Sequence, residues 1–523
     1  MLSACVAFLF LSNPQDPAAG KAAQEPAKKE APQEQAKKPA IPSDRRAGKR
    51  LELSLRDCLG LGSEKNVDLR VSRLLEAMAH EDEGIASAVF EPEFFLTGSW
   101  SRTESPRRSQ IQPSVTSKIY NVTAGLRSRI WTGASLELAF SPSYFEQEVA
   151  SQFAFPTNAF AGGLNVSVDQ PLLRGAWPDY WQADVDRALR EKDARREDRR
   201  RNEQEILDSI VSAYFDLVFT REDYRVILES LEVAREQLRN TEKRIELGEL
   251  AQRDKVADEA EVARREESLI TAENAILDAE DALKRLILPF QAVEDWEIAI
   301  IPVAELGPND PPLRLPDFQS AMRVAEQNRP DLEAKRLRVD QARLNLGKAE
   351  RDLLPGLDLS ASYDADAQRD SFGDLQKDIF QSRFPDYSLS LSLSLPLGNL
   401  AARSKFRKAT LELERQRREL MILILDVQAD LRATLRNVET LAKTIAASRE
   451  SVRLAVSNLD TEKIKLSLDS TTQFEVQRRS QELSDARSRL IRARLNYRVS
   501  LYHLMAVQGR LNARSSLGSE ERK

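Results

Sequence analysis

Two long tracts with a helical pattern constrain this chain more than any other feature of its sequence. The first tract, residues 179–288, contains no proline and one glycine, Gly248. Its apolar residues recur every three or four positions, the spacing of one helical face, as in Ile206, Ile210, Ala213 and Leu217. A helix from about residue 175 to 246 would be roughly 110 Å long at 1.5 Å per residue. A rod of this length cannot lie inside a globule and needs partner helices along its length.

The second tract, residues 397–523, is also free of proline. Gly248 is the expected break of the first tract, because glycine readily ends a helix. The corresponding break of the second tract falls near Ser467–Ser470. We therefore predict two helical hairpins with tips near residues 248 and 467. In each hairpin a long helix is followed by a tight turn and a returning helix.

The segment 386–397, DYSLSLSLSLPL, has the opposite periodicity. Its leucines alternate with serines, so a strand here would carry leucine on one face and serine on the other. The leucine face consists of Leu389, Leu391, Leu393 and Leu395. Such a strand can bury its leucines in a soluble core, or it can turn them to lipid and its serines to a wet lumen. Its length of roughly 10 residues is enough for a tilted strand to cross a bilayer.

Shorter alternating segments predict further strands with one apolar and one polar face. They lie at residues 96–101, 121–127, 135–141, 164–169 and 357–363. Trp131–Ala134 fits a hairpin turn between the second and third of these segments. The stretches 104–119, 142–161 and 364–385 are expected to be loops. In the last of them, Asp364, Asp366 and Asp370 lack the glycine and glutamate of a calcium loop, which favours a hydrated surface loop.

The chain repeats itself with a constant offset of 263 positions, which indicates two structural copies. The matching positions are Cys58-Leu59 and Ala321-Met322, Leu61 and Val324, Asp68-Leu69 and Asp331-Leu332, and Pro92 and Pro355 (355 − 92 = 263). Pro92 and Pro171 are 79 positions apart, whereas Pro355 and Pro396 are 41 apart, so the first copy carries 38 extra residues. The extra residues would form about one hairpin plus a loop, either as additional strands of the sheet or as a surface hairpin.

These patterns divide the chain into segments. Residues 1–50 would hold a signal-like segment, with an apolar run at Ala4–Leu11, and a disordered linker rich in Pro, Ala, Gln and Lys. The first repeat would span residues 51–288 and the second repeat residues 315–511. The connector between them would be residues 289–314, and the tail residues 512–523.

Two or three strands per copy cannot close a barrel, and an open sheet edge cannot lie in lipid. Strands in a membrane would therefore need identical neighbouring subunits that close both the sheet and the helices into a ring. Three subunits would supply about 12 core strands, enough to surround a lumen. The predicted fold class is an α+β membrane protein built from two repeats. The alternative is a soluble coiled-coil scaffold, which leaves the leucine strand and the doubled topology unexplained.

The composition does not favour an enzyme, a cofactor or a nucleic-acid partner. The net charge of −6 is small for 523 residues, which predicts no polyanion partner. Arg187–Arg201 holds seven arginines, but interleaved carboxylates indicate a salt-bridged helix surface. His80 and His503 lie on predicted helices without evident partners, and the sequence has no zinc motif, P-loop, GxGxxG or catalytic triad pattern. We predict that the protein is not an enzyme and holds no metal or cofactor.

Several stretches resemble the TolC-like outer membrane efflux protein family, in the same order twice along the chain. They are 53–69 (LSLRDCLGLGSEKNVDL), 321–332 (AMRVAEQNRPDL), the strand-to-helix junction Gln170–Gly175, the turn Ile245–Gly248 and the start of the last helix, Ser470–Ala486. The resemblance spans about residues 51–511. It implies a homotrimer with a β-barrel in outer membrane lipid and a helical tunnel in the periplasm, for export of small molecules or proteins. It also implies a periplasmic adaptor (membrane fusion) protein and an inner-membrane pump of the RND or ABC type, as in tripartite efflux or type I secretion.

The resemblance also implies contact sites at the two tips. The candidate adaptor contacts are Leu247, Gly248, Glu249, Leu250, Leu466, Ser467 and Leu468. Asp469 and Glu475 could ring a periplasmic mouth and favour cations, because like charges around an opening concentrate counter-ions, or they could lie on a solvated helix face. The chain departs from the family where Ser467 replaces the usual tip glycine, and where Gln473 and Val476 replace aspartates that close the aperture.

Overall fold

A computed structural model describes residues 50–105, 115–149, 157–248, 251–289, 293–303, 315–383, 385–468 and 470–515. All of these residues belong to one compact unit. The expected signal-like segment and linker lie outside the described residues, apart from Arg50. So do most of the connector, most of the tail, two predicted contact residues, Glu249 and Leu250, and the predicted mouth residue Asp469.

Each repeat begins with two short helices. They are α1 (Leu55–Lys65) and α2 (Val67–Ser87) in the first copy, and α5 (Phe318–Asn328) and α6 (Pro330–Arg351) in the second. The two helices of the second copy meet at Arg329, so residues 318–351 do not form one continuous helix. Pro330 disfavours helical backbone at the residue before it, and Arg329 has a ψ of 117°. In the first copy Asn66 makes the break, and its side chain caps α2 by accepting two backbone hydrogen bonds.

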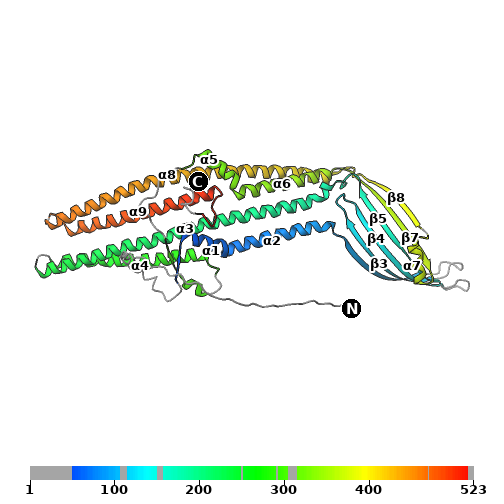
Figure 1. The fold of residues 1–523 in the computed structure, drawn as a ribbon, viewed down its shortest axis with the longest axis horizontal. Helices are drawn as coiled ribbons and strands as arrows, with labels where there is room; N and C mark the ends of the chain where they lie inside the picture. The colour runs from blue at the N-terminus through cyan, green and yellow to red at the C-terminus, as the bar shows by residue number, and fades with distance from the viewer. Residues whose placement is uncertain are drawn as a thin grey trace, which may run out of the picture. The chain divides into compact units, whose positions relative to one another are not determined.

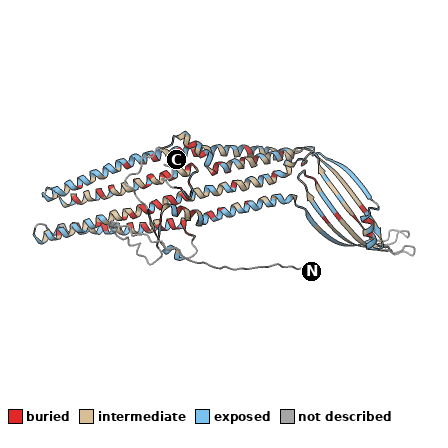
Figure 2. Cartoon of the chain, in the orientation of Figure 1, coloured by how far each residue is buried: buried red, intermediate tan, exposed pale blue. Residues whose placement is uncertain are grey.

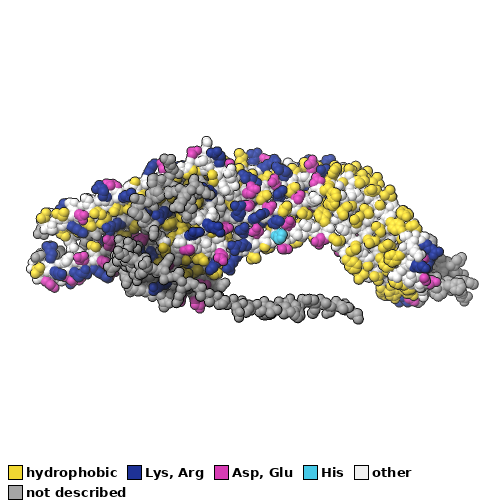
Figure 3. Space-filling view, viewed as in Figure 1, with side chains coloured by type: hydrophobic (Ala, Val, Ile, Leu, Met, Phe, Trp, Pro, Cys, Tyr) yellow, Lys and Arg dark blue, Asp and Glu magenta, His cyan; other side chains and the backbone are white. Residues whose placement is uncertain are grey.

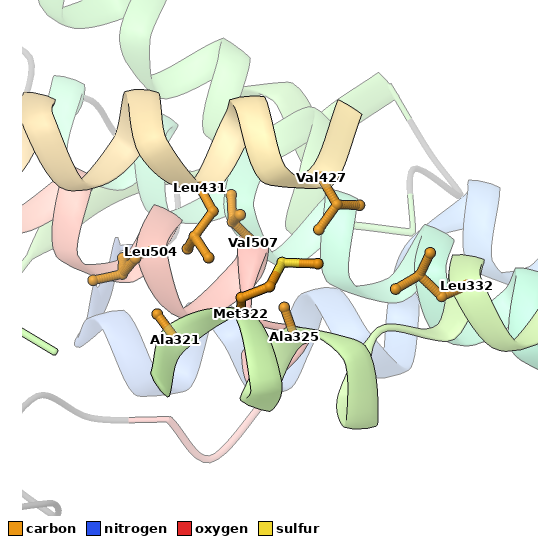
Figure 4. Close-up of a cluster of buried hydrophobic side chains, with 8 residues drawn as sticks. All are labelled: Ala321, Met322, Ala325, Leu332, Val427, Leu431, Leu504 and Val507. Carbon is orange, nitrogen blue, oxygen red and sulfur yellow. The ribbon is translucent and has the colours of Figure 1, made fainter. Parts of the chain in front are cut away.

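The caps and the core keep the offset of the sequence repeat. Ser54 caps α1 and Asp317 caps α5 (317 − 54 = 263). The core positions of the second copy, Ala321, Met322, Ala325 and Leu332, pack against α8 and α9 (Figure 4). Their counterparts in the first copy, Cys58, Leu59, Gly62 and Leu69, are buried as well. Both repeats therefore attach their short helices to the long ones through the same positions.

The long tracts form two helical hairpins. The first consists of α3 (Pro178–Glu246, 69 residues) and α4 (Gln252–Ile287, 36 residues). The second consists of α8 (Leu400–Ser467, 68 residues) and α9 (Gln473–Val507, 35 residues). The predicted stripe of α3 contributes Ile210 and Leu217 to the core. Gly248 follows α3 with a φ of +78°, a conformation that costs glycine little and other residues more.

The described residues contain one six-stranded antiparallel sheet in the order β2-β3-β4-β5-β7-β8. The strands are β2 (Glu93–Ser105), β3 (Val115–Arg129), β4 (Ser135–Val149), β5 (Thr157–Pro171), β7 (Gly356–Arg369) and β8 (Pro385–Ser394). A separate parallel pair joins β1 (Arg50–Leu53) to β6 (Ala299–Pro302). The short 3-10 helices are η2 (Ala88–Phe90) and η3 (Val293–Glu297).

The stretches expected as loops contain regular structure. β3 begins at Val115 and β4 runs to Val149, so the strands extend well into the expected loops 104–119 and 142–161. Their outer halves mix polar and apolar residues on one face, as with Tyr144 and Glu146, and the alternation is lost there.

The expected loop 364–385 was also wrong. Its first residues continue β7, so Asp364 and Asp366 lie in a strand rather than on a loop, on the polar face of the sheet. Helix α7 (Phe372–Phe380) follows β7.

A layer of helices continues from the sheet. Helices α2, α3, α6 and α8 pack side by side in that order, while α4 packs on α3, and α9 packs on α3 and α8 (Figure 1). The chain enters β2 from α2 through η2 and leaves β8 into α8. The same two parts of the chain therefore form the outer edges of both the helical layer and the sheet.

Candidate conduit wall and helical tips

The sheet has one apolar and one polar face along its whole width. A row of directly paired residues across the strands is Phe94, Leu126, Leu138, Val166, Tyr363 and Tyr387. The neighbouring row, on the other face, is Glu93, Arg127, Glu137, Ser167, Ser362 and Ser388. On the polar face Ser362 Oγ lies 2.8 Å from Asp364 Oδ2 and 2.9 Å from Ser388 Oγ. The sheet is thus an amphipathic wall with a hydrophilic side.

The leucines of β8 lie exposed on the apolar face. Leu389, Leu391 and Leu393 are 76%, 64% and 68% exposed, and Leu395 follows the end of the strand with 60% exposure. Figure 2 shows β8 exposed along its length, and Figure 3 shows hydrophobic side chains gathered over the sheet, while charged side chains cover the helices. A soluble sheet would bury these leucines, so the exposed band fits a lipid-facing surface better than a soluble core.

Aromatic side chains form a band across this apolar face. Trp100 pairs with Tyr120, Tyr120 with Tyr144, and Tyr144 with Phe160 in successive strands. The ring centroids of Tyr120 and Tyr144 are 6.2 Å apart, and those of Tyr144 and Phe160 are 4.9 Å apart. Aromatic girdles of this kind mark the interfaces of membrane strands, because an amphipathic ring suits the boundary between lipid and water.

Helix α7 lies on the same apolar face, next to the aromatic band. Its Phe372 packs 5.9 Å from Phe160, measured between ring centroids, and Phe380 packs 6.3 Å from Phe140. Leu375 and Ile379 are buried beneath the helix. Sequence reasoning missed α7, although two signals were present: the apolar spacing 372, 375, 379 and a capping serine, Ser371, that accepts from Asp374.

The helices at the edges of the layer carry exposed apolar stripes. On α2 the stripe is Val67, Val71, Leu74, Leu75, Met78 and Ile85, and on α8 the exposed apolar residues include Leu411, Met421, Ile422 and Leu425. Leu69 of α2 is buried in the single chain, whereas the residues of the α2 stripe are exposed. The remaining apolar stripe faces away from α3, where a further helix could cover it.

The predicted tip residues lie at the ends of the hairpins, remote from the sheet along each helix. Leu247 and Leu468 are 74% and 72% exposed. A Cβ added at Gly248 would meet no atom within 4 Å. Ser467 ends α8 without a glycine, and its hydroxyl donates to the carbonyl of Ile464 at 2.7 Å. The Glu475 carboxylate lies 3.7 Å from the Arg478 guanidinium one turn further along α9.

A buried carboxylate joins the two hairpins near their tips. Asp258 of α4 is 1% exposed and accepts a hydrogen bond from Thr241 of α3 at 2.6 Å. It also accepts from Gln477 of α9. A cavity of about 160 Å³ lies beside these groups, and its lining includes Leu466, Gln473 and Val476. The structure therefore places the residues at the predicted aperture positions between the hairpins of one chain.

Further polar contacts join α3 to α9 along their length. Asp216 pairs with Arg492 at 2.7 Å, and Glu229 with Arg487 at 3.0 Å. His503 Nδ1 lies 2.9 Å from Asp208 Oδ2, so the expectation that His503 has no partner was wrong. This hydrogen bond raises the pKa of the His503 imidazole above its usual value, against the opposing effect of burial. The residues are 295 positions apart, and no local pattern marks the pair.

Carboxylate side chains alternate with the arginines of segment 187–201. Arg195 pairs with Glu191 at 2.8 Å within α3, and Arg199 reaches Glu76 of α2 at 2.6 Å. The segment is a salt-bridged helix surface, as the interleaved charges predicted, and its contact with Glu76 also links α3 to α2. Within the described ranges, no group of three or more His, Cys, Asp or Glu side chains is arranged to hold a metal ion. No helix in the described part of the chain has the length and apolarity to cross a membrane.

An amphipathic sheet joined to two long helical hairpins defines a class of outer membrane conduit subunits, and comparison with known proteins identifies the family. The model of the outer membrane efflux protein family matches residues 62–287 and 321–510, and the chain belongs to this family. Both matched ranges begin in a short helix of a repeat and end at or just beyond its last long helix.

Individual relatives and solved structures agree with this family. The chain is 23% identical to outer membrane protein TolC of Vibrio cholerae, over 68% of this chain and 78% of the relative. It is 23% identical to outer membrane efflux protein BepC of Brucella suis, over 82% and 91%. The fold is similar to the CmeC outer membrane channel of Campylobacter jejuni (TM-score 0.62, 14% identity, 88% and 87% covered) and to CusC (TM-score 0.65, 14% identity, 88% and 92% covered).

The protein is therefore a TolC-like outer membrane channel for efflux, and the predicted α+β fold class, function and location are confirmed. The family consists of channel proteins rather than enzymes. The soluble scaffold alternative is not favoured, because it accounts neither for the family nor for the exposed apolar wall.

Proposed function

We propose that three copies of this chain assemble head to tail into a ring, with a barrel in the outer membrane and a helical tunnel in the periplasm. One observation carries the proposal: the sheet and the helical layer end at the same two edges, β2 with α2 and β8 with α8. The backbone groups of an edge strand need partners in lipid, and an exposed apolar helix face needs cover in water. One neighbouring copy at each edge meets both needs.

The helical edges support this arrangement independently of the strands. The α2 stripe includes Leu74 and Met78, which are 64% and 63% exposed, and Leu411 on α8 is 71% exposed. Apolar stripes at helical spacing form interfaces between helices when they pack into one another. In a head-to-tail ring the α2 stripe of one copy faces the α8 stripe of the next. Residues 51–288 and 315–511 then act as two repeats within each subunit.

The tips are the proposed contacts with a periplasmic adaptor. Leu247, Gly248, Leu466, Ser467 and Leu468 lie at the hairpin ends, and Glu249 and Leu250 complete the first turn in the sequence. The exposed Leu247 and Leu468 offer apolar contacts at the end of each hairpin. Through the adaptor the channel would serve an inner-membrane pump of the RND or ABC type and export small molecules or proteins, as the family resemblance implies.

One set of matched variants tests both contacts. Met78→Glu places a charge in the α2 stripe, Ala77→Glu places the same charge on another side of α2, and Leu468→Glu alters a tip. We expect Met78→Glu to remove most of the heat-modifiable trimer in the outer membrane fraction, because a charge cannot be buried unpaired. Leu468→Glu should keep the trimer but sensitise the cell to exported drugs, and Ala77→Glu should change neither. Trimers that form normally with Met78→Glu would contradict the proposed ring.

A further inference from the structure

We propose that the β3–β4 hairpin, Val115–Val149, adds two strands to the membrane wall of each subunit, so that the conduit is wider at the outer membrane than the repeated core would make it. This inference rests on the proposed ring. Strand β2 of the first copy corresponds to β7 of the second, because their first residues, Glu93 and Gly356, keep the offset (356 − 93 = 263). Strand β5 corresponds to β8, because each leads into the long helix of its copy. The hairpin is the part of the first copy that the second copy lacks.

The pairing of the hairpin is that of a wall strand rather than a surface hairpin. β3 pairs with β2 from Arg127 opposite Glu93 to Val115 opposite Ser105. On its other side, β4 pairs with β5 from Ser135 to Gln147. The hairpin thus separates β2 from β5 along their length, whereas β7 and β8 pair directly with each other. A hairpin on the surface of the wall would leave β2 and β5 as neighbours.

The faces of the hairpin continue those of its neighbours. Leu138 of β4 pairs with Leu126 on one side and Val166 on the other, all on the apolar face. The adjacent residue, Glu137, pairs with Arg127 and Ser167 on the polar face. Each strand of the hairpin therefore has one side suited to lipid and one side suited to water, as a wall strand requires.

The turn of the hairpin is fixed to the start of the long helix. Gln170 Nε2 donates to the Thr132 carbonyl at 3.2 Å, and the Arg129 guanidinium lies 4.2 Å from the ring centre of Trp181 on α3. Gly133 has a φ of +88°, and a Cβ added there would lie 2.3 Å from Trp181 Nε1. These contacts place the turn at the strand-to-helix junction, where all wall strands meet the tunnel.

The added strands change the size of the ring. The sheet has six strands in the described part of each chain, so three subunits would supply 18 strands. If each of the two repeats in a subunit held only the two shared strands, three subunits would supply 12. Five successive antiparallel pairings make β8 antiparallel to β2. The β8 strand of one subunit can therefore pair in antiparallel fashion with the β2 strand of the next subunit. Barrel diameter grows roughly linearly with strand number, so the outer opening would be about half again as wide.

Cysteine labelling in the full chain tests the placement of the hairpin. Leu138→Cys and Glu137→Cys probe the two faces of β4, and Leu389→Cys and Ser390→Cys probe the two faces of β8 as a control. Cys5 is replaced by serine, whereas Cys58 is buried and its thiol pKa is raised to about 12, so it does not react with the reagent. A charged, membrane-impermeant maleimide should label Glu137→Cys and Ser390→Cys at least tenfold faster than Leu138→Cys and Leu389→Cys.

Each labelling pattern has a distinct meaning. Alternation in both strands supports the proposal. Alternation in β8 with equal labelling of the two β4 positions would overturn the added strands and leave the proposed ring intact. Equal labelling of the two β8 positions would overturn the membrane wall itself, and with it both proposals.

The width is tested in planar bilayers with polyethylene glycols of graded size added at the outer side. We expect the intact channel to admit polymers of about half again the radius that a variant without Val115–Val149 admits. Equal size limits would overturn the widening. If the shortened chain does not fold, the labelling of the full chain still decides whether the hairpin lies in the wall.

Discussion

Individual polar residues join parts of this chain that are remote in sequence. Asp258 connects three helices from a buried position, and His503 pairs with Asp208 across the two repeats. Asp258 looks like an ordinary surface residue in the sequence, because charged residues surround it, whereas His503 lies among apolar residues that name no partner. Their partners are set by helix packing, which depends on the whole fold. For this reason sequence reasoning assigned no partner to His503 and no role to Asp258.

The His503 pair predicts a pH-dependent stability. The pKa of the His503 imidazole is raised in the folded chain, mainly by the hydrogen bond to Asp208 and to a smaller extent by the charge of Asp430. The stability that protonated His503 contributes is therefore fully present below its pKa in the unfolded chain, about 6.5. It is lost as the pH rises through the pKa of His503 in the folded chain. We expect His503→Gln to lower the thermal midpoint at pH 5.5 more than at pH 9. Equal losses for His503→Gln at both pH values would contradict the assignment.

At the scale of elements, the predictable parts are those with a strong and regular period. The α3 stripe and the leucine–serine alternation of β8 both predicted the elements that the structure shows. The sequence alone does not reveal the break at Asn66, because a single side-chain cap interrupts an otherwise helical pattern. The outer half of β4 was missed because Pro142 and Glu146 disturb its apolar face. Short helix α7 was missed because a single apolar turn is weak evidence by itself.

Two glycines with different backbone conformations give an element-scale prediction. Gly248 has a φ of +78° at the end of α3, whereas Gly347 lies within helix α6, where an added Cβ would enter open space. Gly248→Ala should destabilise the fold by about 1 kcal/mol, because a left-handed conformation strains alanine. Gly347→Ala should stabilise it by about 1 kcal/mol through helix propensity. Denaturant midpoints of the two variants measure this, and shifts of the same sign would contradict the structural difference.

At the scale of the whole molecule, the six-stranded sheet and the helical layer α2, α3, α6, α8 share one design, in which each element has a neighbour on both sides except those at the two edges. The sequence predicted that a single chain could not close its sheet, because it contained too few strands. It did not predict that α2 and α8 would form the matching helical edges, since exposed and buried stripes look alike in a sequence. Only the packing order α2, α3, α6, α8 distinguishes them.

The two faces of β8 predict how the assembled channel tolerates charge. Leu391→Arg would place a guanidinium on the apolar face, and Ser390→Arg would place it on the polar face. We expect Leu391→Arg to cost about 2–4 kcal/mol of stability in a bilayer, and Ser390→Arg to cost much less. Urea titration of channels refolded into liposomes measures both values. Equal costs for the two variants would show that the strand does not separate lipid from water.

The two outer edges of each subunit differ from one another, and this has a genetic consequence. A ring assembled from such subunits contains one kind of junction, repeated around the axis. A substitution at that junction is therefore present at every junction of the ring, and no unaltered junction remains. A change that weakens one side of the seam can therefore be offset by a change on the other side within the same gene.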